Sequence, residues 1–315
     1  MFIFVFFLET LQFLWLFAST SFWEMVYMVC RNRPRKDIKD SHILITGTSQ
    51  GLGKLLAKKL ASNGNTLHLV DINTTLNEEN IKELTSDECK VFTYHCDIGK
   101  LDSILALKEN VFKNCNKVDY LFNNAGVIVG KLFPETSLKE MNLVMSVDAI
   151  GVMNMTQIFL PEMMEHGGHL IFVSSIAGCV GAPFMTTYTA AKHAVTGFSR
   201  SLLFDLDYMG VDHVKVTTVF PHFTNTGMFS GASVKMPMLF PMLEPDYVAE
   251  QIVIATREER NELILPRVTN YVVVYVYLME CRVFRAYCKL LGNDLMKTFR
   301  QTRDVTIQGA IQNGA

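Results

Sequence analysis

The chain has 315 residues, of which 49% are hydrophobic, and its formal net charge is −2. A chain of this length can bury one α/β domain of about 230 residues and still leave terminal segments outside it. The small net charge and the lack of a basic stripe in the sequence argue against nucleic acid as a partner.

Cysteine and histidine residues show no ligand spacing. The seven cysteines are odd in number and scattered without a CxxC pair, which favours free thiols in a reducing compartment over disulfides or a zinc site. Glu162 and His166 lie at helical spacing, but one such pair is typical of a helix surface. The sequence therefore predicts no metal site.

Residues 1–36 predict a hydrophobic membrane anchor with a basic flank. Residues 2–30 are dense in Phe, Leu, Trp, Val and Met, and Arg and Lys residues follow at once. No positive charge precedes Glu9, which argues against a cleavable signal peptide, and the basic flank predicts that the rest of the chain faces the cytosol. Glu9 and Glu24 would be costly at the bilayer centre, so spanning and monotopic anchors both stay open, as does a core helix of the following domain.

Residues 37–266 alternate between short apolar runs and helical stretches, which predicts one domain. Strands are predicted at residues 42–46, 66–70, 91–96, 118–122, 169–173, 214–219 and 263–265. Helices are predicted at residues 52–62, 101–112, 138–164, 187–208 and 246–255. Repeated βαβ units of this kind indicate a doubly wound parallel sheet of about seven strands with helices on both faces.

The first strand-to-helix turn reads Thr-Gly-Thr-Ser-Gln-Gly-Leu-Gly from Thr46 to Gly53. Its glycines allow a tight turn and the close approach of a pyrophosphate, while the helix that begins there offers free N–H groups and the positive end of its dipole. The turn therefore predicts a dinucleotide site. The expected contacts are Gly47, Ser49, Gln50, Gly51, Leu52 and Gly53.

Asp71, at the end of the second strand, bears on which dinucleotide binds. A carboxylate at this position accepts hydrogen bonds from the ribose hydroxyls and repels a 2′-phosphate, which favours NAD over NADP. Gln50 offers no charge for such a phosphate either. The other interpretation of Asp71 is a helix cap or a turn residue before Asn73.

Ser175, Tyr188 and Lys192 predict proton chemistry on an alcohol. Tyr188 and Lys192 are four residues apart on a predicted helix and so share one face. A phenol acts as a base near neutral pH only if a cation stabilises its phenolate, and Lys192 is that cation. Ser175 follows a predicted strand at its carboxyl end. Tyr188 would take the hydroxyl proton of the substrate while a hydride leaves for NAD.

These motifs together resemble the short-chain dehydrogenase/reductase family from about residue 40 to residue 266. The likeness also includes Cys96-Asp97 after the third strand and Asn123-Asn-Ala-Gly126 after the fourth. It implies a Rossmann-type sheet, with Asp97 at the adenine and Lys192 at the nicotinamide ribose. The further cofactor contacts that the resemblance implies are Asp97, Ile98, Asn124, Ala125, Gly126, Tyr188, Lys192, Pro221 and Thr226. His222 stands where the family often has glycine.

Asp148 departs from the family pattern, which has an asparagine at the fourth catalytic position. Asparagine both donates and accepts hydrogen bonds, whereas an ionised aspartate only accepts them. If Asp148 lies near Lys192, it partly neutralises that cation and weakens its effect on the pKa of Tyr188. We therefore expect a pH optimum displaced upward. The alternative is that the relay tolerates the replacement.

A narrower likeness concerns the anchor, the runs 91–99, 225–229 and 244–247, and the apolar stretch after Arg267. They resemble the membrane-bound branch that contains the retinol dehydrogenases and certain 17-beta-hydroxysteroid dehydrogenases, with the retinol-oxidising members most similar. This resemblance implies a lipophilic substrate reached from membrane lipid, an endoplasmic-reticulum or lipid-droplet location with the catalytic domain in the cytosol, and often a homo-oligomer.

The sequence therefore predicts an oxidoreductase that moves a hydride between a retinol-like alcohol and NAD, with Tyr188 as acid and base. The alternatives are a 17-beta-hydroxysteroid dehydrogenase and a catalytically weak membrane or lipid-droplet interaction protein, for which Asp148 is the only hint.

Three segments outside the motifs complete the prediction. Residues 228–243, rich in Met and Phe, suit a pliable lid over a lipophilic substrate, ordinary core or a membrane-dipping loop. Residues 267–300 predict an apolar, membrane-associated helix region, and the polar residues 301–315 predict a disordered tail.

Overall fold

The computed structural model describes residues 33–61, 64–84, 89–229 and 241–270, together with isolated positions at Trp15, Ala18, Val273, Val276, Arg282, Arg285, Ala286 and Lys289. The chain divides into two units, Met1–Lys36 and Asp37–Ala315, and the second unit contains all the elements below. Most of the predicted anchor, of the segment 228–243 and of the C-terminal helix region, and the whole tail, lie outside the described residues.

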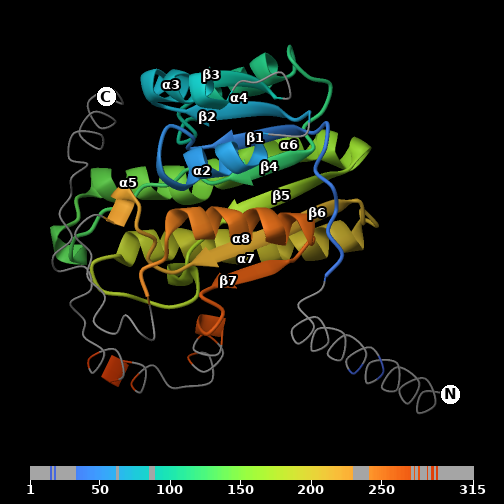
Figure 1. Cartoon of the computed structure of the whole chain (residues 1–315). Coiled ribbons are helices and arrows are strands. Elements are labelled where there is room, and N and C mark those ends of the chain that lie inside the picture. The colour runs from blue at the N-terminus through green and yellow to red at the C-terminus, as the bar shows by residue number, and fades with distance from the viewer. Residues whose placement is uncertain are drawn as a thin grey trace. The chain divides into compact units, whose positions relative to one another are not determined.

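A seven-stranded parallel sheet forms the centre of the second unit, which confirms the predicted fold class (Figure 1). The strands are β1 His42–Thr46, β2 Thr66–Asp71, β3 Lys90–His95, β4 Tyr120–Asn123, β5 Gly168–Val173, β6 Val214–Pro221 and β7 Glu262–Leu265. Their order is β3-β2-β1-β4-β5-β6-β7. The order reverses between β1 and β4, and ligands of doubly wound sheets bind at such a reversal, beyond the carboxyl ends of the strands.

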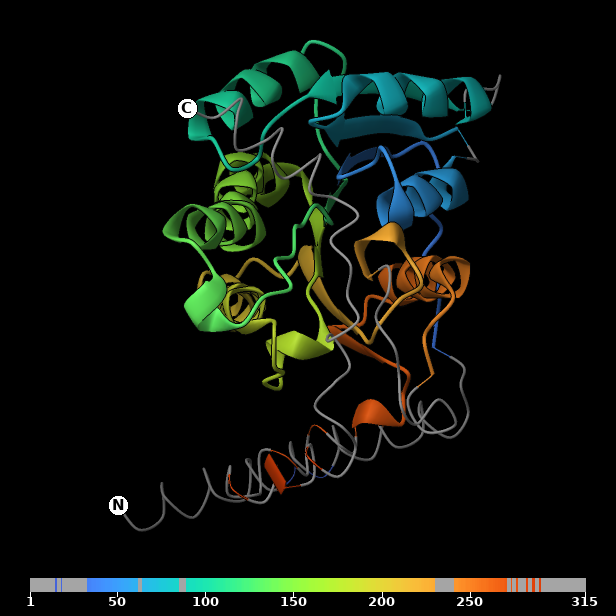
Figure 2. The ribbon, with the colours of Figure 1, turned by 90° about the vertical axis from the view of Figure 1, so that its left-hand side faces the viewer.

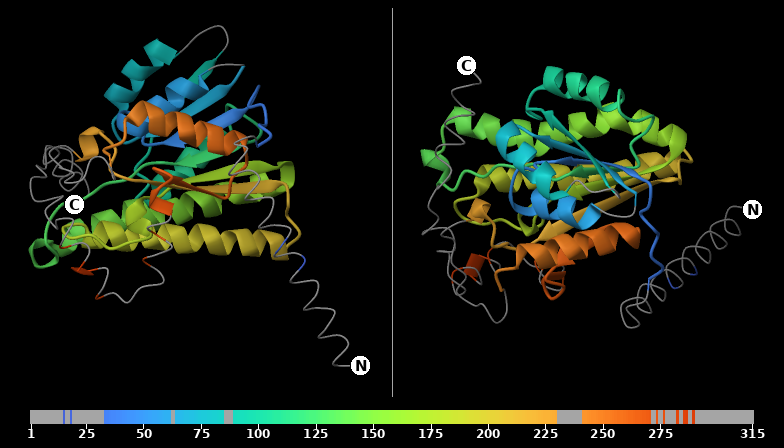
Figure 3. Two further views of the ribbon diagram at one scale, coloured as in Figure 1. Left: turned by 60° about the horizontal axis from the view of Figure 1, so that its bottom comes forward. Right: turned by 45° about the horizontal axis from the view of Figure 1, so that its top comes forward.

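Helices cover both faces of the sheet. They are α2 Gly51–Leu60, α3 Thr74–Leu84, α4 Leu101–Val111, α5 Leu138–Met145, α6 Val152–His166, α7 Thr186–Tyr208 and α8 Pro245–Arg257. Short 3-10 turns lie at Phe133–Glu135, Ile176–Gly178 and Gly227–Phe229. Figure 2 shows α2, α3 and α8 on one side of the sheet and α4, α6 and α7 on the other, and Figure 3 shows α7 running alongside the strands.

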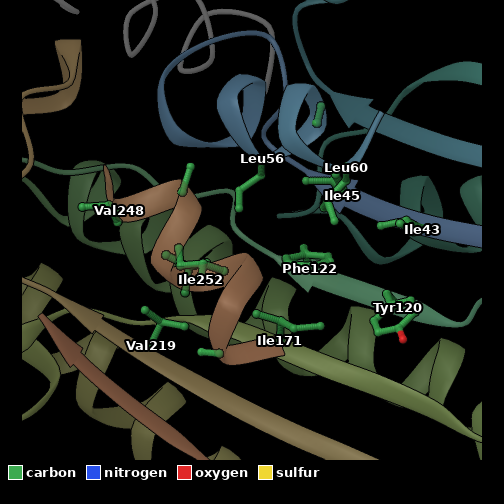
Figure 4. Packing of buried hydrophobic residues seen from close by; sticks show 14 of the residues in the cluster. Ile43, Ile45, Leu56, Leu60, Tyr120, Phe122, Ile171, Val219, Val248 and Ile252 are labelled. Carbon is green, nitrogen blue, oxygen red and sulfur yellow. The ribbon is translucent and has the colours of Figure 1, made fainter. Parts of the chain in front are cut away.

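The core lies on both sides of the sheet because successive side chains of a strand point to opposite faces. Ile43 and Ile45 are fully buried with Leu56 of α2 and Ile252 of α8 (Figure 4). Leu44, between them in sequence, packs into the second cluster under α4 and α6. This two-sided burial explains why the strands are continuous apolar runs rather than alternating ones.

The sequence analysis missed α3 between β2 and β3. The sequence of α3 is mostly polar, so it lacks the apolar periodicity on which a helix prediction depends. Besides Leu84 at its end, α3 buries the polar side chain of Asn77. Asn77 accepts a hydrogen bond from the Thr48 hydroxyl at 2.7 Å and donates one to the Leu69 carbonyl at 3.2 Å.

The helix predicted over residues 138–164 is not one regular helix. A π-helical turn, Ser146–Gly151, separates α5 from α6, and α6 continues to His166. By length and composition alone, the run Leu138–His166 would suffice to cross a membrane. Half of its apolar window is buried inside the domain, where α6 packs against α4 and α7.

Candidate active site

The glycine turn between β1 and α2 fits a dinucleotide phosphate. Gly47 and Gly51 have positive φ angles of 74° and 60°, a conformation that favours glycine. A Cβ on Gly53 would lie 2.0 Å from the Gly47 carbonyl oxygen, so only glycine lets α2 begin this close to the turn. Gln50 gives no side-chain cap to α2, whose first turn contains no acidic residue. An anion is therefore favoured at this end of α2.

Hydrogen bonds fix the turn to the segment after β4. The Asn124 side-chain amide donates to the carbonyls of Thr46 at 2.9 Å and Gly47 at 3.2 Å. The Thr46 hydroxyl accepts from the backbone N–H groups of Asn124 and Ala125, each at 3.0 Å. The predicted contacts Asn124, Ala125 and Gly126 are thereby held beside the glycine turn.

Asp71 lies at the carboxyl end of β2 and is held by two backbone groups. Its Oδ2 accepts from Ser49 N at 2.9 Å and its Oδ1 from Asn73 N at 2.8 Å. Each carboxylate oxygen keeps a further lone pair for a ribose hydroxyl. The side chain that caps α3 is Asn73, whose Oδ1 accepts from Leu76 N at 3.2 Å. Asp71 is thus a turn residue and also lines the cavity.

Asp97 and Ile98 follow β3 on the same edge of the sheet. The Asp97 Oδ1 accepts from Gly99 N at 3.0 Å, and the Lys100 ammonium lies 3.7 Å from Oδ2. Asp97 N donates to the Ser103 hydroxyl at 3.1 Å. These contacts tie the segment to α4, and both Asp97 and Ile98 line the cavity.

Tyr188 and Lys192 lie one turn apart on α7, and both are buried. The Lys192 Nζ is 5.4 Å from the centre of the Tyr188 ring and donates a hydrogen bond to the Val173 carbonyl at 3.1 Å. Ser175 follows β5, and its hydroxyl accepts from Ala177 N at 3.2 Å. The Val173 carbonyl was not predicted, because a backbone acceptor has no signature in the sequence.

Asp148 forms a fully buried ion pair with Lys192. Its Oδ2 lies 3.3 Å from the Lys192 Nζ, at 0% and 4% side-chain exposure respectively. Its Oδ1 accepts from Val127 N at 2.7 Å. The π-helical turn carries Asp148, and a Cβ on Gly126 would lie 3.0 Å from its Oδ2. The condition under which Asp148 partly neutralises Lys192 is therefore fulfilled.

Burial dominates the proton affinities in this cluster. It raises the pKa of Tyr188 above its ordinary value; Lys192 and Ser175 lower that pKa, and Asp148 raises it further. Lys192 and Asp148 thus act on the Tyr188 pKa in the two directions that the sequence analysis expects, and burial makes the net direction upward. Burial opposes charge on Lys192 as well, but the Asp148 carboxylate raises the pKa of Lys192 overall. Burial also raises the pKa of Asp148, with Lys192 acting against it.

One cavity of about 340 Å³ joins these groups at the carboxyl edge of the sheet. The predicted catalytic residues Ser175, Tyr188, Lys192 and Asp148 all line it. So do all the predicted cofactor contacts, namely Gly47, Ser49, Gln50, Gly51, Leu52, Gly53, Asp71, Asp97, Ile98, Asn124, Ala125, Gly126, Pro221 and Thr226. His222 lines the cavity too, and burial lowers its pKa to about 4.

The arrangement combines a phosphate cradle with a proton-transfer group. A dinucleotide fits the glycine turn on steric and charge grounds, since the turn has room for an approaching phosphate and Asp71 can accept from a ribose. Tyr188 and Ser175 line the same cavity. This combination suits hydride transfer with a proton moved by the protein.

Comparison with known proteins agrees with this chemistry. A family model described as short chain dehydrogenase matches residues 41–236. The bovine short-chain dehydrogenase/reductase family 16C member 6 is 36% identical over 87% of both chains. Human epidermal retinol dehydrogenase 2 is 35% identical over 76% of this chain and 78% of its own. Rat retinol dehydrogenase 10 is 30% identical over 98% of both.

Solved structures show the same fold. A short-chain dehydrogenase/reductase from Burkholderia phymatum, solved in complex with NAD, has a TM-score of 0.68 at 25% identity and covers 75% of this chain and 92% of its own. An archaeal alcohol dehydrogenase from Thermococcus sibiricus has a TM-score of 0.63 at 24% identity, over 71% of this chain and 95% of its own. The chain therefore belongs to the short-chain dehydrogenase family and is an NAD(P)-dependent oxidoreductase.

Proposed function

We propose that this enzyme oxidises a lipophilic, retinol-like alcohol with NAD and that Tyr188 takes the alcohol proton. The observation that carries the proposal is the gathering of Tyr188, Lys192 and Ser175 in one cavity with the glycine turn and Asp71. A phenol, an ammonium and a hydroxyl beside a dinucleotide cradle are the groups that this reaction requires.

The chain's own residues bind, orient and deprotonate the substrate. The Ser175 hydroxyl and the Tyr188 oxygen hydrogen-bond the alcohol and fix its orientation. Oxidation starts from the ionised form of Tyr188, whose negative charge the Lys192 ammonium stabilises in a buried site, where its field is little screened. The Tyr188 phenolate accepts the alcohol proton and becomes a neutral phenol. NAD, when bound, supplies the hydride acceptor. In the reverse direction Tyr188 donates its proton to a carbonyl oxygen.

Asp71 supports NAD rather than NADP. Its carboxylate accepts two backbone hydrogen bonds, which fix it at the end of β2 on the cavity wall. The negatively charged carboxylate would repel a 2′-phosphate there, and its two backbone hydrogen bonds prevent it from rotating away. The same carboxylate is an acceptor for ribose hydroxyls, so charge and hydrogen bonding both favour the unphosphorylated cofactor.

Apolar cavity walls and the named relatives support a lipophilic substrate. Ile128, Leu143, Val147 and Met228 line the cavity in addition to the polar groups. Several similar proteins carry the name retinol dehydrogenase. A polyene alcohol matches such walls because it offers one hydroxyl for Ser175 and Tyr188 and a long apolar body.

A substrate panel tests the proposal. Full-length protein in membranes is supplied with NAD and, separately, all-trans-retinol, a 17-beta-hydroxysteroid or a long-chain fatty alcohol, and NADH formation is followed. We expect the highest kcat/KM with retinol and a kcat lower by about 10²–10⁴-fold in a Tyr188→Phe control. A preference for the steroid would favour the steroid dehydrogenase alternative. If none of the three alcohols gave NADH, the result would favour the alternative that the protein is a membrane or lipid-droplet interaction protein.

We also propose that residues 1–36 attach the enzyme to the endoplasmic reticulum or to lipid droplets, with the catalytic domain in the cytosol. The hydrophobic run and its basic flank support this placement. Full-length protein should stay in the membrane pellet after alkaline extraction, and a variant lacking residues 1–36 should lose much of that retention. Full retention of the truncated variant would assign attachment to residues 267–300 instead.

A further inference from the structure

A second cluster of reactive side chains lies away from the cavity. His42 begins β1, His68 lies within β2, and Cys115 follows α4. The three possible ligand atoms, one from each residue, lie within 4.8 Å of one another. His42 is at the amino end of its strand, so this cluster marks the edge of the sheet opposite to the cavity. The sequence analysis predicted no metal site because these residues are far apart along the chain.

The spacing of the atoms matches a tetrahedral zinc site. The His42 Nδ1 and His68 Nε2 are 3.2 Å apart. Zinc bonds of about 2.1 Å to nitrogen and about 2.3 Å to sulfur place tetrahedral ligand atoms about 3.5 Å from one another. The two nitrogens are thus already at a suitable separation, and the Cys115 sulfur lies within 4.8 Å of both.

The ring of His68 is held in place by its neighbours. It stacks on Phe92 and Tyr94, with ring centres 5.6 Å and 5.8 Å away. Its other nitrogen, Nδ1, lies 3.0 Å from the Tyr94 hydroxyl, to which the Asn114 amide donates at 3.1 Å. The Tyr94 hydroxyl can accept a proton from Nδ1, and in that tautomer Nε2 is free to bind a metal. Histidine ligands of metals characteristically have such an acceptor on the second nitrogen.

Cys115 and the surrounding charges suit the same ion. Cys115 is a buried free thiol whose sulfur lies 3.4 Å from the Val111 carbonyl. Asp119 accepts a hydrogen bond from His42 N at 2.8 Å and pairs with Lys117 at 2.6 Å, so its oxygens are engaged. Lys117 and Lys90 add positive charge near His42, and Asp119 and a bound thiolate oppose it. His42 is only partly buried, which leaves a route for an ion from solvent.

We propose that His42, His68 and Cys115 bind a Zn²⁺ ion, with water in the fourth position. Binding releases the thiol proton to solvent, and the proton shared between the two imidazoles moves to the other nitrogen of its ring. Both histidines bind as neutral rings and Cys115 as a thiolate. The site joins β1, β2 and the segment after α4 at the edge remote from the cavity, so its role is to stabilise this part of the sheet rather than to take part in hydride transfer.

Cobalt substitution tests the site on the full-length protein, with any affinity tag removed and bound metal stripped by a chelator. Titration with Co²⁺ should give one equivalent with the near-ultraviolet charge-transfer absorption of a cobalt–thiolate bond, and Zn²⁺ should displace it. Cys115→Ser should abolish this absorption, whereas Cys89→Ser, at another buried cysteine, should keep it. Tyr94→Phe should weaken Zn²⁺ affinity by about 10-fold, since it removes the partner of His68.

Thermal unfolding supplies a second readout. Zn²⁺ should raise the Tm of the wild-type protein and leave the Tm of His42→Asn unchanged, because a ligand that binds only the folded state stabilises it. Absence of the charge-transfer band in the wild type, or its persistence in Cys115→Ser, overturns the proposal. So does an equal Zn²⁺ effect on the Tm of wild type and His42→Asn.

Discussion

The two halves of the cavity are built in different ways. The glycine turn, Asp71 and Asn124 are held mainly by hydrogen bonds with the backbone. Around Tyr188, the positions are held by a buried ion pair between Asp148 and Lys192. Binding at the glycine turn should therefore depend mainly on the shape of the backbone. Catalysis at Tyr188 should depend mainly on the charges of Asp148 and Lys192, which are buried away from water.

Removal of the Tyr188 hydroxyl should give the largest difference between the two halves of the cavity, because it should lower kcat and leave NAD binding nearly unchanged. Tyr188→Phe removes the group that moves the proton, so kcat should fall by about 10²–10⁴-fold. The dissociation constant for NAD, measured by fluorescence titration, should change little because the glycine turn is intact. Tyr208→Phe serves as the control, since Tyr208 lies on the same helix and is 93% exposed. A large loss of NAD affinity in Tyr188→Phe would mean that the halves are not independent.

A side chain at Gly53 should distort the glycine turn, which is the half of the cavity that depends on shape. A Cβ there would lie 2.0 Å from the Gly47 carbonyl oxygen and 2.6 Å from the Asn124 amide nitrogen, so the backbone must move. We expect Gly53→Ala to lower the free energy of unfolding in urea by about 1–3 kcal/mol and to weaken NAD binding. Gly197→Ala is the matched control in α7, where the added Cβ meets nothing within 4 Å. That substitution should stabilise the protein by about 0.5–1 kcal/mol, because alanine favours a helix.

Neutralising Asp71 should change cofactor choice without altering the catalytic half. Asp71→Asn keeps one acceptor for the backbone but removes the charge that opposes a 2′-phosphate. The ratio of kcat/KM for NAD to that for NADP should fall by about 10-fold, equivalent to about 1.4 kcal/mol. Asp97→Asn is the comparison, and it should leave the ratio nearly unchanged. An unaltered ratio in Asp71→Asn would contradict the assignment of NAD.

Asp148→Asn gives the smallest expected effect, and it concerns the pH dependence. The carboxylate raises the pKa of Tyr188, and oxidation requires an ionised Tyr188, so activity climbs as pH rises through that pKa. Removing the charge lowers this pKa and should move the rising limb of the kcat profile to lower pH. Activity near neutral pH then increases. Asp102→Asn, at an exposed position of α4, is the control. An unchanged profile would support the alternative that the relay tolerates aspartate.

The sequence predicted what local patterns encode and missed what depends on packing. Buried strands and the glycine turn have short-range signatures, so all seven strands and the turn were found. Helix α3 buries the polar Asn77 and, at its end, Leu84, and this pair gives no apolar period. Identities in the catalytic half were predictable, but the direction of the Tyr188 pKa was not, because burial is a property of the whole fold. The joining of His42 to His68 likewise requires the pairing of β1 with β2.

The π-helical turn at Ser146–Gly151 makes segment length as important as residue identity. Such a turn contains one residue more than a regular α-helix would need, and each residue turns a helix by about 100°. A single-residue deletion here would leave every side chain chemically unchanged and yet rotate α5 against α6 by that angle. After such a rotation, Leu143 of α5 could not stay in the cavity wall while the buried residues of α6 kept their present contacts. Sequences that share the aspartate but differ by one residue in this stretch would therefore direct its carboxylate elsewhere.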